Sequence, residues 1–350
     1  MKVGRKKVQK KILITGAAGF IGSNVLDYLF LKYPNFSFIA LDALTYAGNL
    51  KNFSSRIQKS PRFHFEYGDV RNSTIVDNLV AQSDIVIHFA AETHVTRSIY
   101  DNVKFFETDV LGTQAVSNAV YHHKNKVERF LHISTCEVYG SGKTNKMDES
   151  HPLNPHSPYA AAKAGADRLV YSYYTTYKIP AIILRPFNIF GPRQHLEKAI
   201  PRFITSCILN EPLTVHGDGT SKRDYMHVND VATAIELLIN APLKKVAGKA
   251  FNIGSGRAIS IKEIASIIAK YMKVSQSQIQ FLRDRPGQVS TFACNYDKIK
   301  KLLGWAPKKD FYKGLVETIR WYKENQDIWR EQIWLRNVPI LLTDGTIVYH

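Results

Sequence analysis

A glycine-rich turn close to the N-terminus constrains the fold of this chain more than any other feature. Gly16, Gly19 and Gly22 follow the apolar, β-branched run KILIT and precede the amphipathic segment SNVLDYLFLKY, after which a second apolar run, FSFIALD, begins. A strand, a tight turn, a helix and a second strand in this order form a βαβ unit with parallel strands. The sequence therefore predicts a parallel sheet that starts at Lys11.

The alternation of apolar runs and amphipathic segments continues beyond this unit. Candidate strands are FHFEYGD, DIVIHFAA, RFLHIST and AIILRPFN, and candidate helices are STIVDNLVAQ and residues 115–122. A long helix is expected from Ser157, because Ser-Pro supplies an N-cap and a proline in the first turn. The succession predicts an α/β fold, a Rossmann-type doubly wound parallel sheet that binds ligands at the carboxyl ends of its strands.

The pattern breaks into shorter pieces after Gly191. We expect helices over 201–209, 231–239, 261–272 and 315–324, and a pair of strands near LTVHGDG and RDYMHV. The chain is accordingly divided into a basic tail (1–10), a dinucleotide-binding domain (11–190), a mainly substrate-binding, mixed α/β domain packed on the first (191–325), and a C-terminal extension without an assigned role (326–350).

Composition limits the compartment and the partners. The 350 residues are 45% hydrophobic, and the three cysteines, Cys136, Cys207 and Cys294, form no metal-ligand motif, which favours a cytoplasmic location and no metal. No apolar window reaches the roughly 18 residues of a membrane span. The net charge of +17 is dispersed outside residues 2–11. It therefore favours attraction of small phosphorylated anions over nucleic-acid binding.

The glycine turn and Asp42 together indicate a dinucleotide cofactor. Glycines let the backbone approach a pyrophosphate, and the following helix offers free N–H groups to it. Asp42 ends the second strand, where its carboxylate would accept hydrogen bonds from a ribose diol and repel a 2′-phosphate, which favours NAD over NADP. Asp69 is predicted to face the adenine amine, with a turn role as the alternative. Ala90 and Ala91 are small where a dinucleotide would pass, although packing explains them equally well.

A tyrosine and a lysine on one helical face supply the candidate chemistry. Tyr159 and Lys163 are four residues apart, and Ser134 and Thr135 end the preceding strand. An ammonium near a phenol lowers the phenol's pKa from about 10, so Tyr159 could take a proton from a sugar hydroxyl while a hydride passes to nicotinamide. The expected cofactor contacts are Gly16, Gly19, Phe20, Ile21, Gly22, Asp42, Asp69, Val70, Ala90, Ala91, Thr108, Ser134, Tyr159 and Lys163.

A series of motifs in register from about Lys11 to Trp321 resembles the extended short-chain dehydrogenases/reductases that act on nucleotide sugars, the NAD-dependent epimerase/dehydratase family. The likeness is greatest to the dTDP-glucose 4,6-dehydratases. The motifs are TGAAGFIGSN, LDALTYAGNL, HFAAETHVTRSI, STCEVYG, SPYAAAKAGAD, NIFGPRQHLEKAIPRFI, RDYMHVNDVA, FNIGSG and RDRPG.

The resemblance implies a reaction and a set of residues. Tyr159 would accept the 4-hydroxyl proton as NAD takes the C4 hydride, and Glu137 would remove the C5 proton. Water would then leave from C6 and the hydride return there, which gives a 4-keto-6-deoxy sugar nucleotide. The implied catalytic residues are Thr135, Cys136, Glu137, Tyr159 and Lys163, and the implied substrate contacts are Thr93, Thr135, Asn188, Lys198, Arg223, Asn252 and Arg285. The family also implies a homodimer through a helix pair that includes the helix of Tyr159.

The sequence departs from the dehydratase pattern on the side of the site that faces the sugar. Cys136 stands where these enzymes have an aspartate that donates a proton to the departing hydroxyl. A thiol with a pKa near 8.5 is a weaker acid and donor, and packing is the alternative role. Thr96 also replaces an aspartate, and the sequence QVS at 288–290 replaces a charged run.

These departures leave alternatives open. The chain could act as a UDP-hexosamine 4,6-dehydratase, as a 5,6-dehydratase with a Cys-Glu pair, or as a UDP-glucuronate decarboxylase. A rival of another class is a non-catalytic dinucleotide-binding protein with a basic interaction surface. An intact set of Tyr159, Lys163 and Glu137 counts against that rival.

Overall fold

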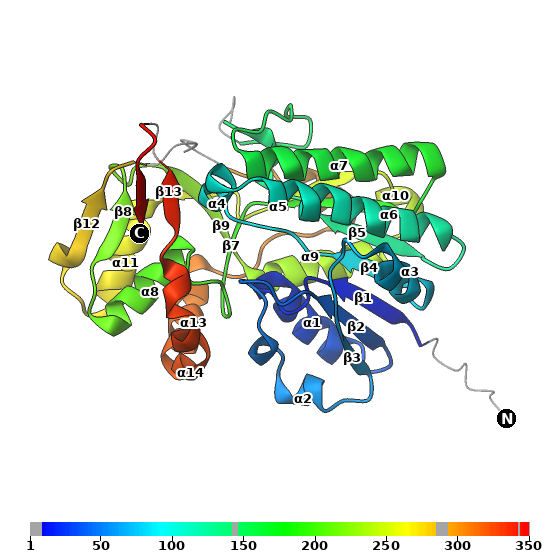
Figure 1. Cartoon of the computed structure of the whole chain (residues 1–350), viewed down its shortest axis with the longest axis horizontal. Helices are drawn as coiled ribbons and strands as arrows, with labels where there is room; N and C mark the ends of the chain where they lie inside the picture. The colour runs from blue at the N-terminus through cyan, green and yellow to red at the C-terminus, as the bar shows by residue number, and fades with distance from the viewer. Residues whose placement is uncertain (1–8, 142–145, 285–292, 342–343, 350) are drawn as a thin grey trace.

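The computed structural model describes residues 9–141, 146–284, 293–341 and 344–349. Two lobes are visible, the larger built on a seven-stranded sheet in the order β10-β6-β5-β4-β1-β2-β3 (Figure 1). All neighbours in this sheet are parallel, as the βαβ pattern predicts. The strands are β1 (Lys11–Thr15), β2 (Ser37–Asp42), β3 (Phe63–Tyr67), β4 (Ile85–His88), β5 (Arg129–Ile133), β6 (Ala181–Pro186) and β10 (Ala250–Ile253).

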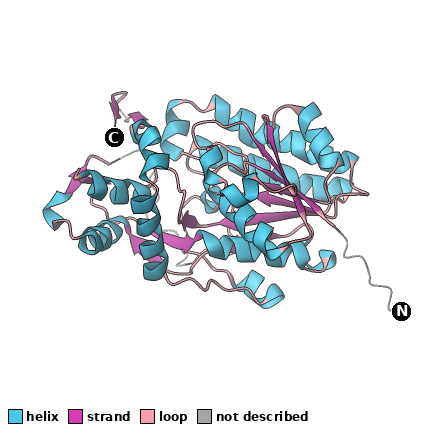
Figure 2. Ribbon diagram, turned by 90° about the horizontal axis from the view of Figure 1, so that it is seen from below, coloured by secondary structure: helices cyan, strands magenta, loops and turns pink. Residues whose placement is uncertain are grey.

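Helices cover both faces of the sheet (Figure 2). The side chains of β1 alternate between the faces, because Ile12 and Ile14 pack in one core cluster and Leu13 packs in another. One cluster includes α1 (Phe20–Lys32) and α9 (Val228–Asn240), and the other includes α3 (Ser73–Ala81), α6 (Thr113–His122) and α7 (Pro158–Tyr177). The order of the strands reverses between β1 and β4, which is where a doubly wound sheet binds its ligands.

The expected domain boundary at residue 190 differs from the structure. The chain returns to the larger lobe after it has entered the smaller one: α9 packs against α1, and β10 extends the sheet beside β6. Ile299 of α12 (Asp297–Leu303) and Trp305 join the same core. The physical reason is that α9 and β10 are themselves apolar elements, which bury their faces on a sheet that would otherwise have an uncovered side and edge.

The smaller lobe surrounds a second apolar core built by α8 (Ala199–Leu209), α11 (Ile261–Met272) and α13 (Phe311–Glu324). The expected pairing of LTVHGDG with RDYMHV is wrong. β8 (Leu213–His216) pairs in parallel with β12 (Ile279–Leu282), whereas β9 (Lys222–His227) lies between β7 (Asn188–Phe190) and β11 (Ala258–Ser260). Two adjacent apolar runs resemble a hairpin in the sequence. In the structure, however, each pairs with strands that are not adjacent to it in the chain.

The C-terminal extension lies where the two lobes meet. It consists of α14 (Gln326–Trp329), η5 (Arg330–Arg336) and a hairpin of β13 (Pro339–Leu341) and β14 (Ile347–Tyr349), with β13 against α4 (Val95–Tyr100) (Figure 1). No helix of the described residues has the length and apolarity needed to cross a membrane. The remaining short elements are η1 (Leu50–Asn52), α2 (Ser55–Gln58), α5 (Val103–Phe105), η2 (Phe106–Gly112), η3 (Cys136–Tyr139), α10 (Leu243–Val246) and η4 (Gln276–Gln278).

Candidate active site

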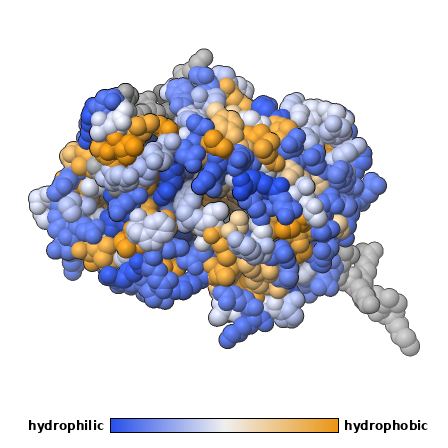
Figure 3. Space-filling view, in the orientation of Figure 1, coloured by the Kyte–Doolittle hydropathy of each residue, from blue (hydrophilic) through white to orange (hydrophobic). Residues whose placement is uncertain are grey.

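A cavity of about 460 Å³ opens between the lobes at the carboxyl ends of the sheet strands. Its wall includes residues of the glycine turn, the ends of β2, β4 and β5, the start of α7 and parts of α8, β8 and β9. The space-filling view shows a hollow in this face, bordered by hydrophilic residues (Figure 3). All the expected cofactor contacts from Gly16 to Lys163 line this cavity.

The glycine turn forms a cradle that larger residues could not form. Gly16 has a φ of +67°, and a Cβ there would lie 2.6 Å from the backbone nitrogen of Ala90. A Cβ at Gly22 would lie 2.3 Å from the carbonyl oxygen of Gly16. Gly19 precedes α1 and supplies no side-chain cap, so the first N–H groups of α1 remain available to an anion. The turn thus fits a pyrophosphate.

Two carboxylates lie at the strand ends beyond this turn. Asp42 is buried and accepts hydrogen bonds from the backbone N–H of Ala18 and of Leu44, both at 2.8 Å. Burial raises its pKa against the lowering effect of these hydrogen bonds. Asp69 lines the cavity but also forms an ion pair with Arg71 at 2.8 Å, so it combines a turn role with a place at the expected adenine end.

Five buried polar atoms of residues in the cavity wall have no hydrogen-bond partner among the residues that the structure describes. They include Oγ of Ser134 and Oδ1 of Asn188. Buried polar groups are usually satisfied, so these atoms are suited to bonding a molecule bound in the cavity. Together with the cradle and Asp42 they fit a dinucleotide and its substrate.

The catalytic candidates meet where β5 ends. Thr135 caps η3, since its Oγ1 accepts a hydrogen bond from the N–H of Glu137 at 3.2 Å, and its side chain also hydrogen-bonds Tyr159. Ser157 caps α7 by accepting from the N–H of Ala160 at 3.2 Å, which fixes Tyr159 in the first turn. Glu137 and Tyr159 keep exposed surface and line the cavity. A phenol and a carboxylate therefore face the same space.

The expected lowering of the tyrosine pKa is not found in the structure. Burial raises the pKa of Tyr159 well above its ordinary value, and the charges of Asp109 and Glu137 raise it further. Lys163 is buried and donates to the carbonyl oxygen of Ile133 at 2.8 Å, and burial lowers its pKa against the pull of Asp109 and Asp167. The hydrogen bond of Lys163 therefore holds α7 against the end of β5.

Cys136 is buried in an apolar cluster with Val138, Tyr139, Phe187 and, among others, Cys294. Burial raises its pKa well above the ordinary thiol value, and the neighbouring Glu137 adds to the effect. Cys136 nevertheless lines the cavity. The thiol is therefore a protonated, packed side chain at the edge of the site, a position compatible with both of its expected roles.

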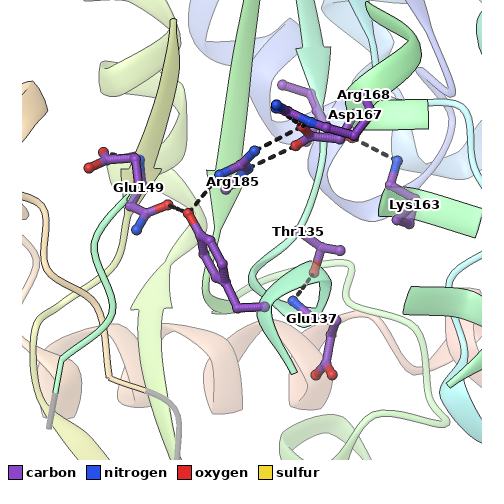
Figure 4. A network of polar contacts seen from close by, with 10 residues as sticks. Thr135, Glu137, Glu149, Lys163, Asp167, Arg168 and Arg185 are labelled. Atoms are coloured by element: carbon purple, nitrogen blue, oxygen red, sulfur yellow. Dashed lines mark hydrogen bonds and ion pairs between the residues drawn. The ribbon is translucent and has the colours of Figure 1, made fainter. Parts of the chain in front are cut away.

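A polar network behind the site supports the catalytic segment (Figure 4). Arg185 on β6 binds Asp167 of α7 through two hydrogen bonds of 2.8 Å and donates to the hydroxyl of Tyr139 at 2.9 Å. Tyr139 donates in turn to Asn252 at 2.7 Å. The carboxylate of Glu137 points away from this network (Figure 4).

This network accounts for Asn252, which the structure does not bring to the cavity. Asn252 has no exposed surface, and its amide donates to the carbonyl oxygen of Met147 at 3.1 Å while its backbone N–H bonds Glu149 at 2.7 Å. Its side chain is therefore committed to the interior. The expectation that it contacts substrate is replaced by a structural role beneath η3.

The other expected substrate contacts that the structure describes line the cavity: Thr93, Thr135, Asn188, Lys198 and Arg223. Lys198 donates to the carbonyl oxygen of Thr93 at 2.7 Å, so it joins α8 to the segment after β4. Arg285 and the segment 288–290 lie outside the described residues. Thr96 is buried on α4 and also lines the cavity.

Sequence reasoning missed the buried carboxylates that flank the site. Asp109 has no exposed surface, lies on the π-helical segment η2, and accepts from the N–H of Glu92 at 2.8 Å. Burial raises its pKa to about 7 against the attraction of Lys163. Glu197 is also buried and pairs with Arg97 at 2.9 Å. The available signal was a charged residue among apolar neighbours, which is common and rarely specific.

The fold and the site together define a class. A doubly wound sheet that carries a glycine cradle, an acidic residue at the end of β2 and a Tyr-x-x-x-Lys helix facing a strand-end threonine is the arrangement of the extended short-chain dehydrogenases/reductases. The family model described as GDP-mannose 4,6 dehydratase matches residues 13–318. The chain belongs to this family.

Known proteins resemble the chain over most of its length. It is 39% identical over 324 residues to a dTDP-glucose 4,6-dehydratase of Actinoplanes sp., with 91% of this chain and 99% of the relative covered. It is 42% identical over 311 residues to the low-salt glycan biosynthesis protein Agl12 of Haloferax volcanii, with 89% and 98% covered. Among solved structures, the dTDP-glucose 4,6-dehydratase DesIV of Streptomyces venezuelae, with NAD and TYD bound, has a TM-score of 0.88 and 37% identity, with 92% of this chain and 99% of that one covered.

Proposed function

We propose that this protein is an NAD-dependent nucleotide-sugar 4,6-dehydratase that acts on dTDP-glucose or a close analogue. One observation carries the proposal: Tyr159, Thr135 and Glu137 face the same cavity as the glycine cradle and Asp42. An oxidoreductase that transfers hydride alone needs the phenol and the cradle. A carboxylate beside them adds a base for removing a carbon-bound proton.

The cofactor fits the residues present. The cradle of Gly16, Gly19 and Gly22 would hold the pyrophosphate, and Asp42 would bind the adenosine ribose. Ser134 and Lys163 line the same cavity and would bind the nicotinamide ribose. When bound, NAD supplies a reversible hydride acceptor. Oxidation at C4 and reduction at C6 then balance, so that no external reductant is consumed.

The protein side chains perform the proton transfers. Tyr159 takes the proton of the sugar 4-hydroxyl, helped by the hydrogen bond from Thr135, which favours the phenolate. Glu137 takes the C5 proton, which the C4 ketone has made acidic. The C6 hydroxyl leaves as water after it receives a proton. As the hydride returns to C6, a proton returns to C5. The net loss is therefore the 4-hydroxyl proton and the C6 hydroxide, which gives the 4-keto-6-deoxy sugar and water.

The opposite side of the cavity suits the nucleotide diphosphate. Arg223 and Lys198 provide positive charge, and Asn188 provides a buried amide oxygen that has no partner in the described part of the chain. Relatives named as dTDP-glucose 4,6-dehydratases support dTDP-glucose as substrate. A UDP-hexosamine or UDP-glucuronate substrate is the alternative, because Cys136 and Thr96 alter the sugar-facing wall.

A panel of dTDP-, UDP- and GDP-hexoses, analysed by mass spectrometry after incubation with the protein and NAD, tests the proposal. We expect at least one donor to lose the mass of one water molecule, about 18 Da. In Glu137→Gln, C5 proton exchange should stop while reduced cofactor accumulates, because C4 oxidation does not need this carboxylate. The absence of any product from every donor would refute the function.

The assembly and the location are part of the proposal. Exposed apolar side chains on α5, η2, α6 and α7 support a homodimer through this helical face; they are Val103, Phe106, Leu111, Tyr121, Tyr171 and Tyr177. The three cysteines are free and buried, which supports a reducing, cytoplasmic location. Analytical ultracentrifugation would test the dimer.

A further inference from the structure

Part of the cavity wall comes from the C-terminal extension. Val338 and Ile340 line the cavity, and each is only 4% exposed. Both belong to the segment 326–349, which follows the last residue matched by the family model, residue 318. An extension that merely trailed from the fold would leave such side chains in solvent. This one inserts them between the lobes.

The extension is fastened to the smaller lobe by a buried arginine. Arg336 donates to Oγ of Ser206 at 2.6 Å and forms an ion pair with Glu211 at 2.9 Å, while its carbonyl oxygen accepts from Arg202 at 2.6 Å. Arg336 and Ser206 are both buried. The start of β13 is therefore held at a fixed position beside α8.

The extension is also fastened to the larger lobe. Glu331 pairs with Lys51 at 2.7 Å, and β13 packs against α4. Figure 1 shows β13 between the small lobe and α4. Because both lobes hold the segment, Val338 and Ile340 form a fixed wall rather than a loose flap.

Of the parts of a nucleotide sugar, the nucleobase is the one that suits this apolar wall. Branched aliphatic side chains offer no hydrogen bonds, so sugar hydroxyls or a diphosphate packed against them would lose their bonds to water without replacement. The flat face of a nucleobase loses little there. Polar groups that could bond the edge of a base lie next to the wall. Arg202 donates to the carbonyl oxygen of Arg336 and to Oγ1 of Thr214, the latter at 3.2 Å. Arg202 and Thr214 both line the cavity.

We propose that β13 forms the nucleobase wall of the substrate site, with Val338 and Ile340 packed against the base of the nucleoside diphosphate sugar. The proposal rests on the proposed function, since it assumes that the cavity binds a sugar nucleotide. It places a determinant of nucleotide affinity and choice outside the part of the chain that the family shares.

Binding of dTDP, UDP and GDP to the NAD-saturated enzyme, measured by isothermal titration calorimetry, tests this assignment. Val338→Ala with Ile340→Ala removes five carbon atoms from the wall, and we expect the dissociation constant of the preferred nucleoside diphosphate to rise about tenfold. Ile340→Trp should fill the space and weaken binding further. The matched control is Ile347→Ala: Ile347 pairs with Leu341 in the same hairpin but is 43% exposed and does not line the cavity.

Cofactor affinity separates a local effect from a loss of folding. NAD should bind all three variants and the parent protein equally, because the glycine cradle is on the larger lobe. If a nucleoside diphosphate binds the parent and the double variant with the same affinity, or if Ile347→Ala weakens binding as much, the wall assignment is wrong. If none of the three nucleoside diphosphates binds the parent, the proposed function itself fails.

Discussion

The pairing of Arg185 with Asp167 allows a quantitative test of what holds the catalytic segment. Their side chains are 3% and 0% exposed, and they share two hydrogen bonds of 2.8 Å. Arg168 binds the same carboxylate from the adjacent position, but its side chain is 46% exposed. Two arginines on one aspartate, one buried and one exposed, form a matched pair.

Arg185→Met should destabilise the protein by about 3–5 kcal/mol, since it removes the buried partner and leaves the Asp167 charge in the interior. It also removes the bond to the Tyr139 hydroxyl. Arg168→Met should cost less than about 1 kcal/mol, because solvent screens an exposed pair. For a chain of this length, roughly 2 °C per kcal/mol corresponds to a fall in melting temperature of about 6–10 °C for Arg185→Met and under about 2 °C for Arg168→Met.

Thermal unfolding of the three proteins, followed by circular dichroism at neutral pH, measures both values. Equal losses for the two variants would show that burial does not set the strength of this pair. An unchanged melting temperature for Arg185→Met would refute the reasoning outright. The kcat should also fall in Arg185→Met, because Tyr139 belongs to η3, the short segment that presents Glu137.

Three further predictions follow from single side chains. Cys136→Asp places a carboxyl group in a buried setting beside Glu137, where burial keeps it protonated, so water elimination should accelerate or the product should change. Cys136→Ser is the control. Identical product profiles by mass spectrometry would assign Cys136 to packing. Tyr159→Phe should lower kcat by at least about 100-fold with NAD binding retained, measured by steady-state rates and calorimetry, and a small effect would exclude Tyr159 as the base. In Asp109→Asn, stability relative to the parent should improve as pH rises from about 4 to about 7. The native pKa of Asp109 is about 7, so in this window the native parent holds a proton that the unfolded parent has released, and the parent loses stability as pH rises. A difference in melting temperature between variant and parent that is the same at about pH 4 and at about pH 7 would contradict this reasoning.

The order of elements in the larger lobe could be predicted because it depends on local periodicity. Each predicted strand from KILIT to AIILRPFN forms a parallel strand of the sheet, and the predicted cap at Ser157 begins the expected long helix. The placement of the glycine cradle, Asp42, Tyr159 and Lys163 around one cavity follows from the same alternation, since parallel strands end at one edge.

Features that depend on partners distant in the chain could not be predicted in this way. β8 and β9 are neighbours in sequence, yet each pairs with a strand that the apolar pattern does not specify. The sequence around Asn252 does not show whether its amide lies in the cavity or, as observed, bonds Tyr139 in the interior. The extension shows the same limit, because nothing in WLRNVPILL indicates which lobe its apolar residues enter.

The difference between the expected and the observed effect on Tyr159 has a physical meaning for the reaction. A phenol becomes a base only if its anion is stabilised, and in the protein alone burial and the charges of Asp109 and Glu137 act against the anion. Lys163 is committed to the Ile133 carbonyl oxygen, although an ammonium has three donors. Filling the cavity with a positively charged nicotinamide ring would shift the balance towards the phenolate. The hydrogen bond from Thr135 acts in the same direction, so the basicity of Tyr159 would depend on both.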